Sequence, residues 1–435
     1  MNTYILAIES SCDDTSAAVL QDTMNQPSQR YSLFIIGTLF FVFGFVTWIN
    51  SQLIPFLKQV CELKTDTQAY LVTFAFYISY FFMSIPSSYI LKKTGFAKGM
   101  SLGLFTMAGG SLLFIPAALY QTYSLFLIAL FVQGTGLSLL QTASNPYAVV
   151  LGPPESAARR ISIMGVCNKV AGMIGVFLFG TILFSNIEAI SSNLTLLSGE
   201  AYQTELQVLS MRLVTPYIVI AVMLCLLACM VLRSKLPKIE AEEIPNEKSK
   251  KSIFSYPYLW LGVIAIFAYV GAEVIAIDTL SLYGNFHGFS SDVAKNFSVF
   301  SLIALTIGYF AGIALMPKYI SQRTALIISC ILALCMGGIA LFVPAKLSIG
   351  LIIALSFAHA MMWPCIFPLA IEGLGKHTKL GSALLIMAVA GGAVLPLLYG
   401  FLAESTTRQT AYLILMPLYL YILFFSVYGY KIGKN

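Results

Sequence analysis

Long apolar segments recur along the chain from residue 31 to residue 430. A membrane-spanning helix needs about 20 mainly apolar residues, because each residue of an α-helix adds about 1.5 Å to its length. Twelve segments meet this requirement: residues 31–57, 69–91, 98–120, 123–150, 161–185, 209–232, 256–283, 295–316, 323–343, 347–372, 380–401 and 409–430. The pattern therefore predicts an all-α membrane protein with 12 transmembrane helices.

One long polar stretch interrupts this pattern in the middle of the chain. Residues 233–255 carry charges of both signs and two prolines, and they separate six predicted spans from six others. The two halves also share short identities, since Leu151 and Gly152 correspond to Leu374 and Gly375. We expect a six-helix half at residues 31–232, a cytoplasmic linker at 233–255 and a second six-helix half at 256–435.

Composition and charge exclude several other classes of protein. Hydrophobic residues make up 58% of the chain and charged residues only 10%, whereas soluble proteins carry about 25% charged residues. The net charge of +6 does not indicate nucleic-acid binding, because most Lys and Arg residues fall in alternate connections, on the side that holds both termini. The bias predicts cytoplasmic termini and a multi-pass protein of the plasma membrane, the inner membrane of a bacterium. The eight Cys residues are scattered without metal-ligand spacing.

Polar side chains lie inside two neighbouring spans. Gln141 and Asn145 belong to the fourth span, and Asn168 and Lys169 belong to the fifth. A Lys at the centre of a membrane helix costs about 2.5–3.5 kcal/mol on insertion scales, so such residues usually face a bundle interior or a water-filled cavity. These positions predict a binding site near the middle of the membrane.

Several long motifs carry a resemblance to a known family. They are QTASNPY at residues 141–147, LGPPES at 151–156, PSSYILKKTGFAKG at 86–99, YVGAEVIAIDT at 269–279 and PCIFPLAIEGLGKHTKLGSALLIMAVAGGAVLP at 364–396. In this order they resemble the fucose, galactose and glucose symporter family of the major facilitator superfamily, over residues 31–430. The resemblance implies two six-helix halves, uptake of a monosaccharide such as glucose, galactose, fucose or N-acetylglucosamine, and coupling to a cation.

A sugar needs aromatic faces for its C–H surface and paired donors and acceptors for its hydroxyl groups. The candidate substrate contacts are Trp48, Asn50, Gln52, Gln141, Asn145, Asn168, Lys169, His359 and Trp363. Alternatives remain open at this stage. Trp48 could mark a membrane interface, the amides could hold helices together, and His359 could be a hydrogen-bonded packing residue.

The sequence departs from the proton-coupled members of that family at two acidic positions. Their carboxylates in helices 1 and 4 align with Ser51 and Gln141, which cannot titrate, and a family glutamine in helix 5 aligns with Gly165. The remaining acids within the spans, Glu273 and Asp278, are the candidates for coupling to H⁺ or Na⁺. The alternatives are a salt bridge between Glu273 and Lys169, and a facilitator that couples to no ion.

The first residues do not fit the membrane pattern. Residues 4–20, YILAIESSCDDTSAAVL, resemble the opening strand of the ATPase that makes threonylcarbamoyladenosine in tRNA. No stretch of the chain supplies a phosphate-binding loop, so we expect no enzyme activity. We expect residues 1–30 to be a disordered tail without a function of its own, derived from a fusion or a misassigned start upstream of Met24.

The expected partners are the sugar and membrane lipid, and no nucleic acid; we predict a monomer without a resident cofactor.

Overall fold

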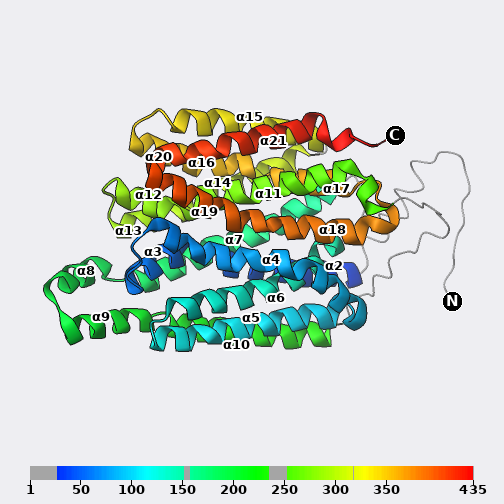
Figure 1. Cartoon of the computed structure of the whole chain (residues 1–435). Coiled ribbons are helices and arrows are strands. Elements are labelled where there is room, and N and C mark those ends of the chain that lie inside the picture. Colours follow the sequence, from blue (N-terminus) through cyan, green and yellow to red (C-terminus); the bar gives the residue numbers. More distant parts are fainter. Residues whose placement is uncertain (1–26, 151–156, 235–251, 317, 435) are drawn as a thin grey trace, which may run out of the picture.

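The computed structural model describes residues 27–150, 157–234, 252–316 and 318–434. Within these ranges 12 helical segments are long and apolar enough to cross a membrane. Figure 1 shows that they lie side by side in one elongated bundle. The predicted number of spans is therefore confirmed. The predicted tail falls almost wholly, and the predicted linker mostly, outside the described residues.

Six of the spans form the first half of the bundle. Its helices are α2 (Pro27–Trp48), α3 (Asn50–Val60), α4 (Asp66–Thr94), α5 (Phe96–Leu119), α6 (Tyr123–Val150), α7 (Ala157–Leu183), α8 (Ile187–Leu196), α9 (Gly199–Met211) and α10 (Val214–Arg233). Helix α4 starts with a capping box, in which the Thr65 side chain and the Gln68 side chain each accept a bond from the other residue's backbone N–H. Residues 186–208, which lie between two predicted spans, contain α8 and most of α9.

The other six spans form the second half. Its α-helices are α11 (Pro257–Asp278), α12 (Leu280–Phe286), α13 (Ser291–Ala294), α14 (Phe297–Leu315), α15 (Gln322–Ala340), α16 (Ala345–His359), α17 (Met362–Ile371), α18 (Thr378–Met387), α19 (Gly391–Ser405), α20 (Arg408–Ala411) and α21 (Leu415–Val427). Short 3₁₀ turns join some of them, including η4 (Ala388–Ala390) between α18 and α19. Figure 1 shows the first half below and the second half above.

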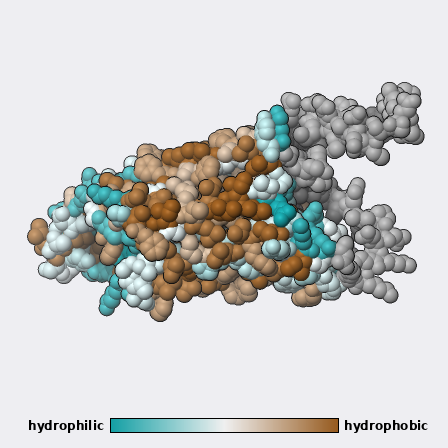
Figure 2. All heavy atoms as spheres, turned by 90° about the horizontal axis from the view of Figure 1, so that it is seen from above, coloured by the Kyte–Doolittle hydropathy of each residue, from teal (hydrophilic) through white to brown (hydrophobic). Residues whose placement is uncertain are grey.

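The surface between the two ends of the bundle is apolar. On the face seen in Figure 2, brown hydrophobic residues form a belt across the middle of the molecule, and hydrophilic residues lie toward both ends. Large apolar side chains such as Phe82, Phe177 and Leu226 are more than half exposed. In water such a surface would be costly, whereas lipid tails solvate it, so the belt fits a membrane protein.

The two halves meet mainly through two spans of the first half. Helix α4 packs against α18 and α19, and α7 packs against α14 and α17. Glycines allow the backbones to approach each other in these contacts. A Cβ atom at Gly392 would lie 3.1 Å from the ring of Tyr77, and one at Gly400 would lie 2.7 Å from the ring of Tyr70. Small residues are typical of close helix packing in membranes.

Several spans consist of two successive helices with a short break between them. Helices α2 and α11 each have 22 residues, and in each case a second helix resumes after a single residue, Ile49 or Thr279. Near these breaks, hydroxyl groups bond to the helix backbone: Ser51 Oγ donates to the Trp48 carbonyl at 2.8 Å, and Thr279 Oγ1 donates to the Ile275 carbonyl at 2.7 Å. Such bonds offer the backbone an alternative to regular helix, and broken helices in membranes typically line cavities.

Candidate functional site

A cavity of about 100 Å³ lies between the two halves of the bundle. Helices α2, α4, α6 and α7 of the first half and α11, α14, α17 and η4 of the second contribute to its wall. A buried water needs about 10–15 Å³ on the same scale, so the cavity has room for several. Its lining combines aromatic rings, amides and one ion pair.

Trp48 is held firmly at this cavity. Its Nε1 donates to Asn168 Oδ1 at 3.2 Å, and Asn168 Nδ2 donates to the Phe40 carbonyl at 3.3 Å. Gly172 packs against the indole, since a Cβ atom there would lie 2.3 Å from Trp48 Cδ1. Gly44 lets α2 approach the backbone of Asn168 so closely that no side chain would fit between them. The indole, only 3% exposed, is therefore a fixed ring at one wall.

Lys169 and Glu273 form an ion pair across the cavity. Lys169 Nζ lies 3.0 Å from Glu273 Oε1, and the two side chains are 7% and 8% exposed. The same Nζ lies 4.1 Å from the centre of the Trp48 ring, within the range of a cation–π contact. Lys169 belongs to α7 and Glu273 to α11, so the pair links the two halves. The salt bridge that the sequence left as an alternative is present.

Four tyrosines complete the wall: Tyr77, Tyr80, Tyr269 and Tyr309. None of them is among the predicted site residues, although each is an aromatic residue with a hydroxyl inside an apolar span. Tyr309 explains the glycine at position 165, because a Cβ atom on Gly165 would lie 2.6 Å from the Tyr309 ring. The ring occupies the space that a larger side chain at this position would need.

The structure brings most of the predicted site residues together. Those that line the cavity are Trp48, Gln141, Asn145, Asn168, Lys169, Glu273 and Trp363. Their positions on five helices from both halves could not be read from spacing along the chain. The ring of Trp363 lies 6.4 Å from that of Tyr269, so the second half also presents aromatic surface.

Four other predicted residues lie outside the lining of this cavity. Gln52 Nε2 donates to the Lys295 carbonyl at 2.8 Å, and both amide atoms of Asn50 are buried without a hydrogen-bond partner among the described residues. His359 Nε2 bonds to the Tyr419 hydroxyl at 2.7 Å, an arrangement that fits the packing alternative. Asp278, 2% exposed, accepts a long bond of 3.4 Å from Thr73 Oγ1.

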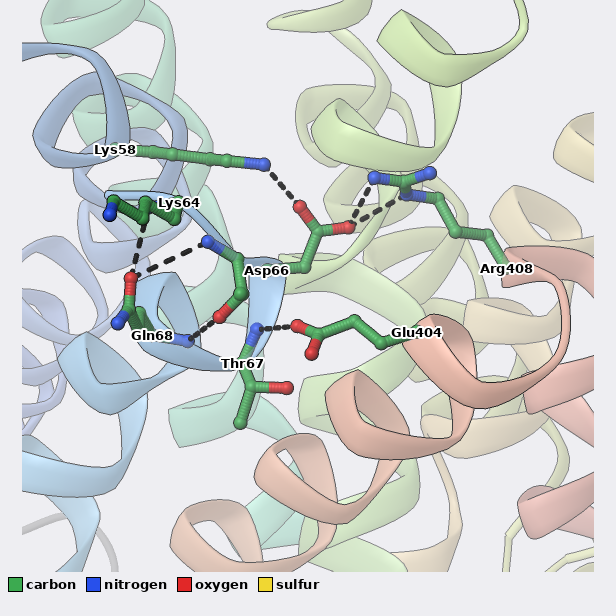
Figure 3. Close-up of polar contacts among 8 residues, drawn as sticks. Lys58, Lys64, Asp66, Thr67, Gln68, Glu404 and Arg408 are labelled. Carbon is green, nitrogen blue, oxygen red and sulfur yellow. Dashed lines mark hydrogen bonds and ion pairs between the residues drawn. The ribbon is translucent and has the colours of Figure 1, made fainter. Parts of the chain in front are cut away.

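A second group of charges joins the halves at the end of the bundle opposite the C-terminus, which we call the distal end (Figure 1). Asp66, at the start of α4, pairs with Lys58 and with Arg408 of α20, whose Nη2 lies 2.6 Å from Asp66 Oδ2 (Figure 3). The Asp66 side chain is 3% exposed, while Lys58 and Arg408 are 26% and 23% exposed. Beside it, the Thr67 N–H donates to Glu404 Oε1 at 2.7 Å. We call Lys58, Asp66 and Arg408 the distal cluster.

The distal cluster is not among the residues predicted from the sequence. Lys58, Asp66 and Arg408 lie close to the ends of predicted spans, and none of them is a predicted site residue. Position along the chain gave no sign that Asp66 and Arg408, 342 residues apart, would be neighbours. The one feature of the sequence that could have indicated this cluster is that its three charged residues lie close to the ends of predicted helices. Among the described residues no group of three or more His, Cys, Asp or Glu side chains is placed to hold a metal ion.

Comparisons with known proteins agree with this architecture. The family model of the Major Facilitator Superfamily matches residues 36–396. A glucose/galactose transporter of Brucella abortus is 34% identical over 94% of this chain and 97% of its own length. The L-fucose-proton symporter of Escherichia coli is 30% identical over 89% of this chain and 90% of its own length. The crystal structure of a fucose:proton symporter from E. coli has a TM-score of 0.74 at 27% identity, covering 92% of this chain and 99% of the other.

Proposed function

Because the chain belongs to the Major Facilitator Superfamily, with sugar transporters among its full-length relatives, we propose that it carries a monosaccharide across the membrane by alternating access. The substrate is a hexose such as glucose or galactose, or a close relative such as fucose or N-acetylglucosamine. The protein is a transporter and not an enzyme, and the 12 spans in the part of the chain that the structure describes make it a multi-pass membrane protein.

The observation that carries this proposal is the composition of the central cavity. Trp48 and Trp363 offer aromatic surface from opposite halves, and Gln141, Asn145 and Asn168 offer amides that both donate and accept. Aromatic faces with nearby amides suit a ring that has apolar C–H faces and polar edges. A site near the middle of the membrane, between two halves that repeat each other, is the arrangement that alternating access requires.

The distal cluster then acts as the outer gate. The Lys and Arg bias along the chain assigns the distal end to the outside and both termini to the cytoplasm. Lys58 and Asp66 belong to the first half and Arg408 to the second, so the two halves must part at this contact when the cavity opens outward. We assign the protein to the plasma membrane, the inner membrane in a bacterium, as a monomer that binds no nucleic acid.

Coupling to H⁺ or Na⁺ is part of the proposal, with Glu273 as the cation-binding residue and Asp278 as the second candidate. Both are buried carboxylates in or at the end of α11, and such groups need a cation or a proton in the membrane. An uncoupled facilitator is the second candidate function, and Ser51 and Gln141 favour it because neither can titrate.

The test is uptake of labelled glucose, galactose, fucose and N-acetylglucosamine into proteoliposomes. Each sugar is offered with an imposed proton gradient, with a sodium gradient and with neither, alongside counterflow exchange. We expect one gradient to concentrate a sugar, and Glu273→Gln to retain exchange but lose accumulation. Equilibration under every condition identifies a facilitator, and no movement of any sugar refutes the proposed substrate class.

A further inference from the structure

Two features of the Lys169–Glu273 pair are not explained by a purely structural salt bridge. Lys169 and Glu273 are the only charged residues in the described lining of the cavity. The other titratable groups of that lining are the phenols of Tyr77 and Tyr80 on α4, Tyr269 on α11 and Tyr309 on α14. Glu273 thus has one nearby positive charge there, and that charge is attached to the other half of the protein.

Lys169 also covers an aromatic surface that a sugar would use. Its Nζ lies 4.1 Å above the Trp48 ring centre. Trp48 is fixed by its bond to Asn168 and by its contact with Gly172. An ammonium group and the C–H face of a sugar cannot lie on the same ring face at once, so a sugar that stacks on this face must move the ammonium away.

Moving Lys169 has an electrostatic consequence for Glu273. A carboxylate that loses its partner in a buried site is strongly disfavoured, and it regains stability by binding a proton or a cation. The three N–H donors of the displaced ammonium then serve sugar hydroxyls or cavity water. Sugar binding and cation binding become linked through one side chain.

We propose that Lys169 is a tethered cation that occupies both Glu273 and the Trp48 face in the sugar-free carrier, and that the arriving sugar displaces it so that Glu273 binds the co-transported cation. This inference rests on the proposed function. It assigns an order, with sugar first and cation second. It also explains how the sugar-free carrier reorients without an external cation, because its central charges are already paired.

The experiment measures cation binding to the purified full-length protein in detergent, with and without saturating glucose, galactose or fucose. Proton uptake is followed with a pH dye in weakly buffered solution, and sodium uptake with ²²Na⁺. For the wild type we expect no stoichiometric binding without sugar and stoichiometric uptake when sugar is added. For Lys169→Met we expect the cation to be bound already in the absence of sugar, so that sugar triggers no further uptake.

Matched variants separate this result from a general loss of folding. Lys169→Gln repeats the test with a polar side chain, and Glu273→Gln must abolish cation binding in both conditions. Lys169→Met/Glu273→Gln has no charge to compensate and should bind sugar with an affinity that does not depend on cation concentration. The wild-type measurement decides the inference even where a variant does not fold.

The possible outcomes distinguish the inference from the function on which it rests. If a sugar binds and is transported, but the wild type takes up no cation on binding it, the inference is wrong and the transport function stands. Cation binding to the sugar-free wild type at the level of Lys169→Met would also overturn the inference. If no sugar of the panel binds or is transported, the proposed function itself fails.

Discussion

Among the described residues, two groups of charges join the halves of this protein, and they differ in their surroundings. The Lys169–Glu273 pair lies in the central cavity with both side chains less than 10% exposed. In the distal cluster one buried carboxylate, Asp66, is shared by two cations that are about a quarter exposed. In the described lining of the cavity each central charge has only the other as a charged partner, whereas the distal cations can turn to water. We therefore expect the central pair to govern stability and coupling, and the distal cluster to govern access.

The largest effect should come from removing one member of the central pair. Glu273→Ala leaves the Lys169 ammonium buried without its partner, which typically costs about 3–5 kcal/mol. We expect a large fall in the thermal unfolding midpoint of the purified protein. Lys169→Met/Glu273→Met should recover most of it, because a neutral pair of similar volume is often as stable as a buried ion pair.

The control for this comparison is the exposed pair between Lys295 and Asp292, whose Nζ–Oδ1 distance is 2.6 Å. Surface pairs contribute about 0–1 kcal/mol, so Asp292→Asn should leave the midpoint nearly unchanged. If Glu273→Ala and Asp292→Asn behaved alike, the contrast between buried and exposed pairs would not hold.

Breaking the distal cluster should change access more than folding. Asp66→Asn removes the negative charge that Lys58 and Arg408 share, and it turns one of the two accepting oxygens into an NH₂ donor. Hydrogen bonds to charged groups are worth about 1.5–3 kcal/mol each. We expect the outward-open state to become more populated. Thr47 lines the cavity, so a cysteine introduced there reports access to it. If the outward-open state is favoured by about 1.4 kcal/mol more than in the parent, its population relative to the closed state rises about tenfold. The cysteine should then react on the order of tenfold faster with a membrane-impermeant maleimide.

Glu372→Gln is the matched control for the access experiment. Glu372 pairs with Lys434 at 2.6 Å, but both residues belong to the second half, so this pair does not join the halves. Its removal should not alter labelling of the introduced cysteine. Labelling of the native cysteines is measured in the protein without the Thr47 substitution and subtracted. If the cysteine at position 47 were labelled equally fast with and without Asp66→Asn, the distal cluster would not act as a gate.

A milder change in the central site is Trp48→Phe. Phenylalanine keeps an aromatic face but cannot donate to Asn168 Oδ1, a bond of 3.2 Å here. A single hydrogen bond contributes about 0.5–1.5 kcal/mol, so we expect sugar affinity in counterflow to fall by about two- to twelvefold. Gln59→Asn, outside the cavity, should leave affinity unchanged. Unaltered affinity in Trp48→Phe would show that the ring's orientation is set by packing alone.

The smallest effect should come from salt. Raising ionic strength to about 1 M shortens the screening length to about 3 Å, which weakens exposed pairs and leaves buried pairs largely intact. Maleimide labelling at position 47 should rise modestly with salt in the wild type and not in Asp66→Asn. The midpoint difference between the wild type and Lys169→Met/Glu273→Met should stay constant with salt, and a strong salt dependence would mean that water reaches the central pair.

The sequence by itself determined the membrane class, the number of spans and their approximate limits. These properties depend on the length and composition of contiguous segments, since each span must bury its own backbone bonds and present apolar side chains to lipid. It also indicated where a site would lie, because Asn168 and Lys169 are costly in lipid wherever the helices pack. The motifs added the family, which the comparisons bear out.

Only the tertiary structure decided which polar groups meet. Lys169 and Glu273 are 104 residues apart, and the sequence could offer their ion pair only as an alternative to separate roles. Gln52 carries an amide like those of the cavity, yet it lies beyond the break after Trp48 and donates to the Lys295 carbonyl. His359, the last residue of α16, bonds to the Tyr419 hydroxyl. Contacts between distant segments depend on how rigid helices rotate and pack, and no local pattern along the chain records that geometry.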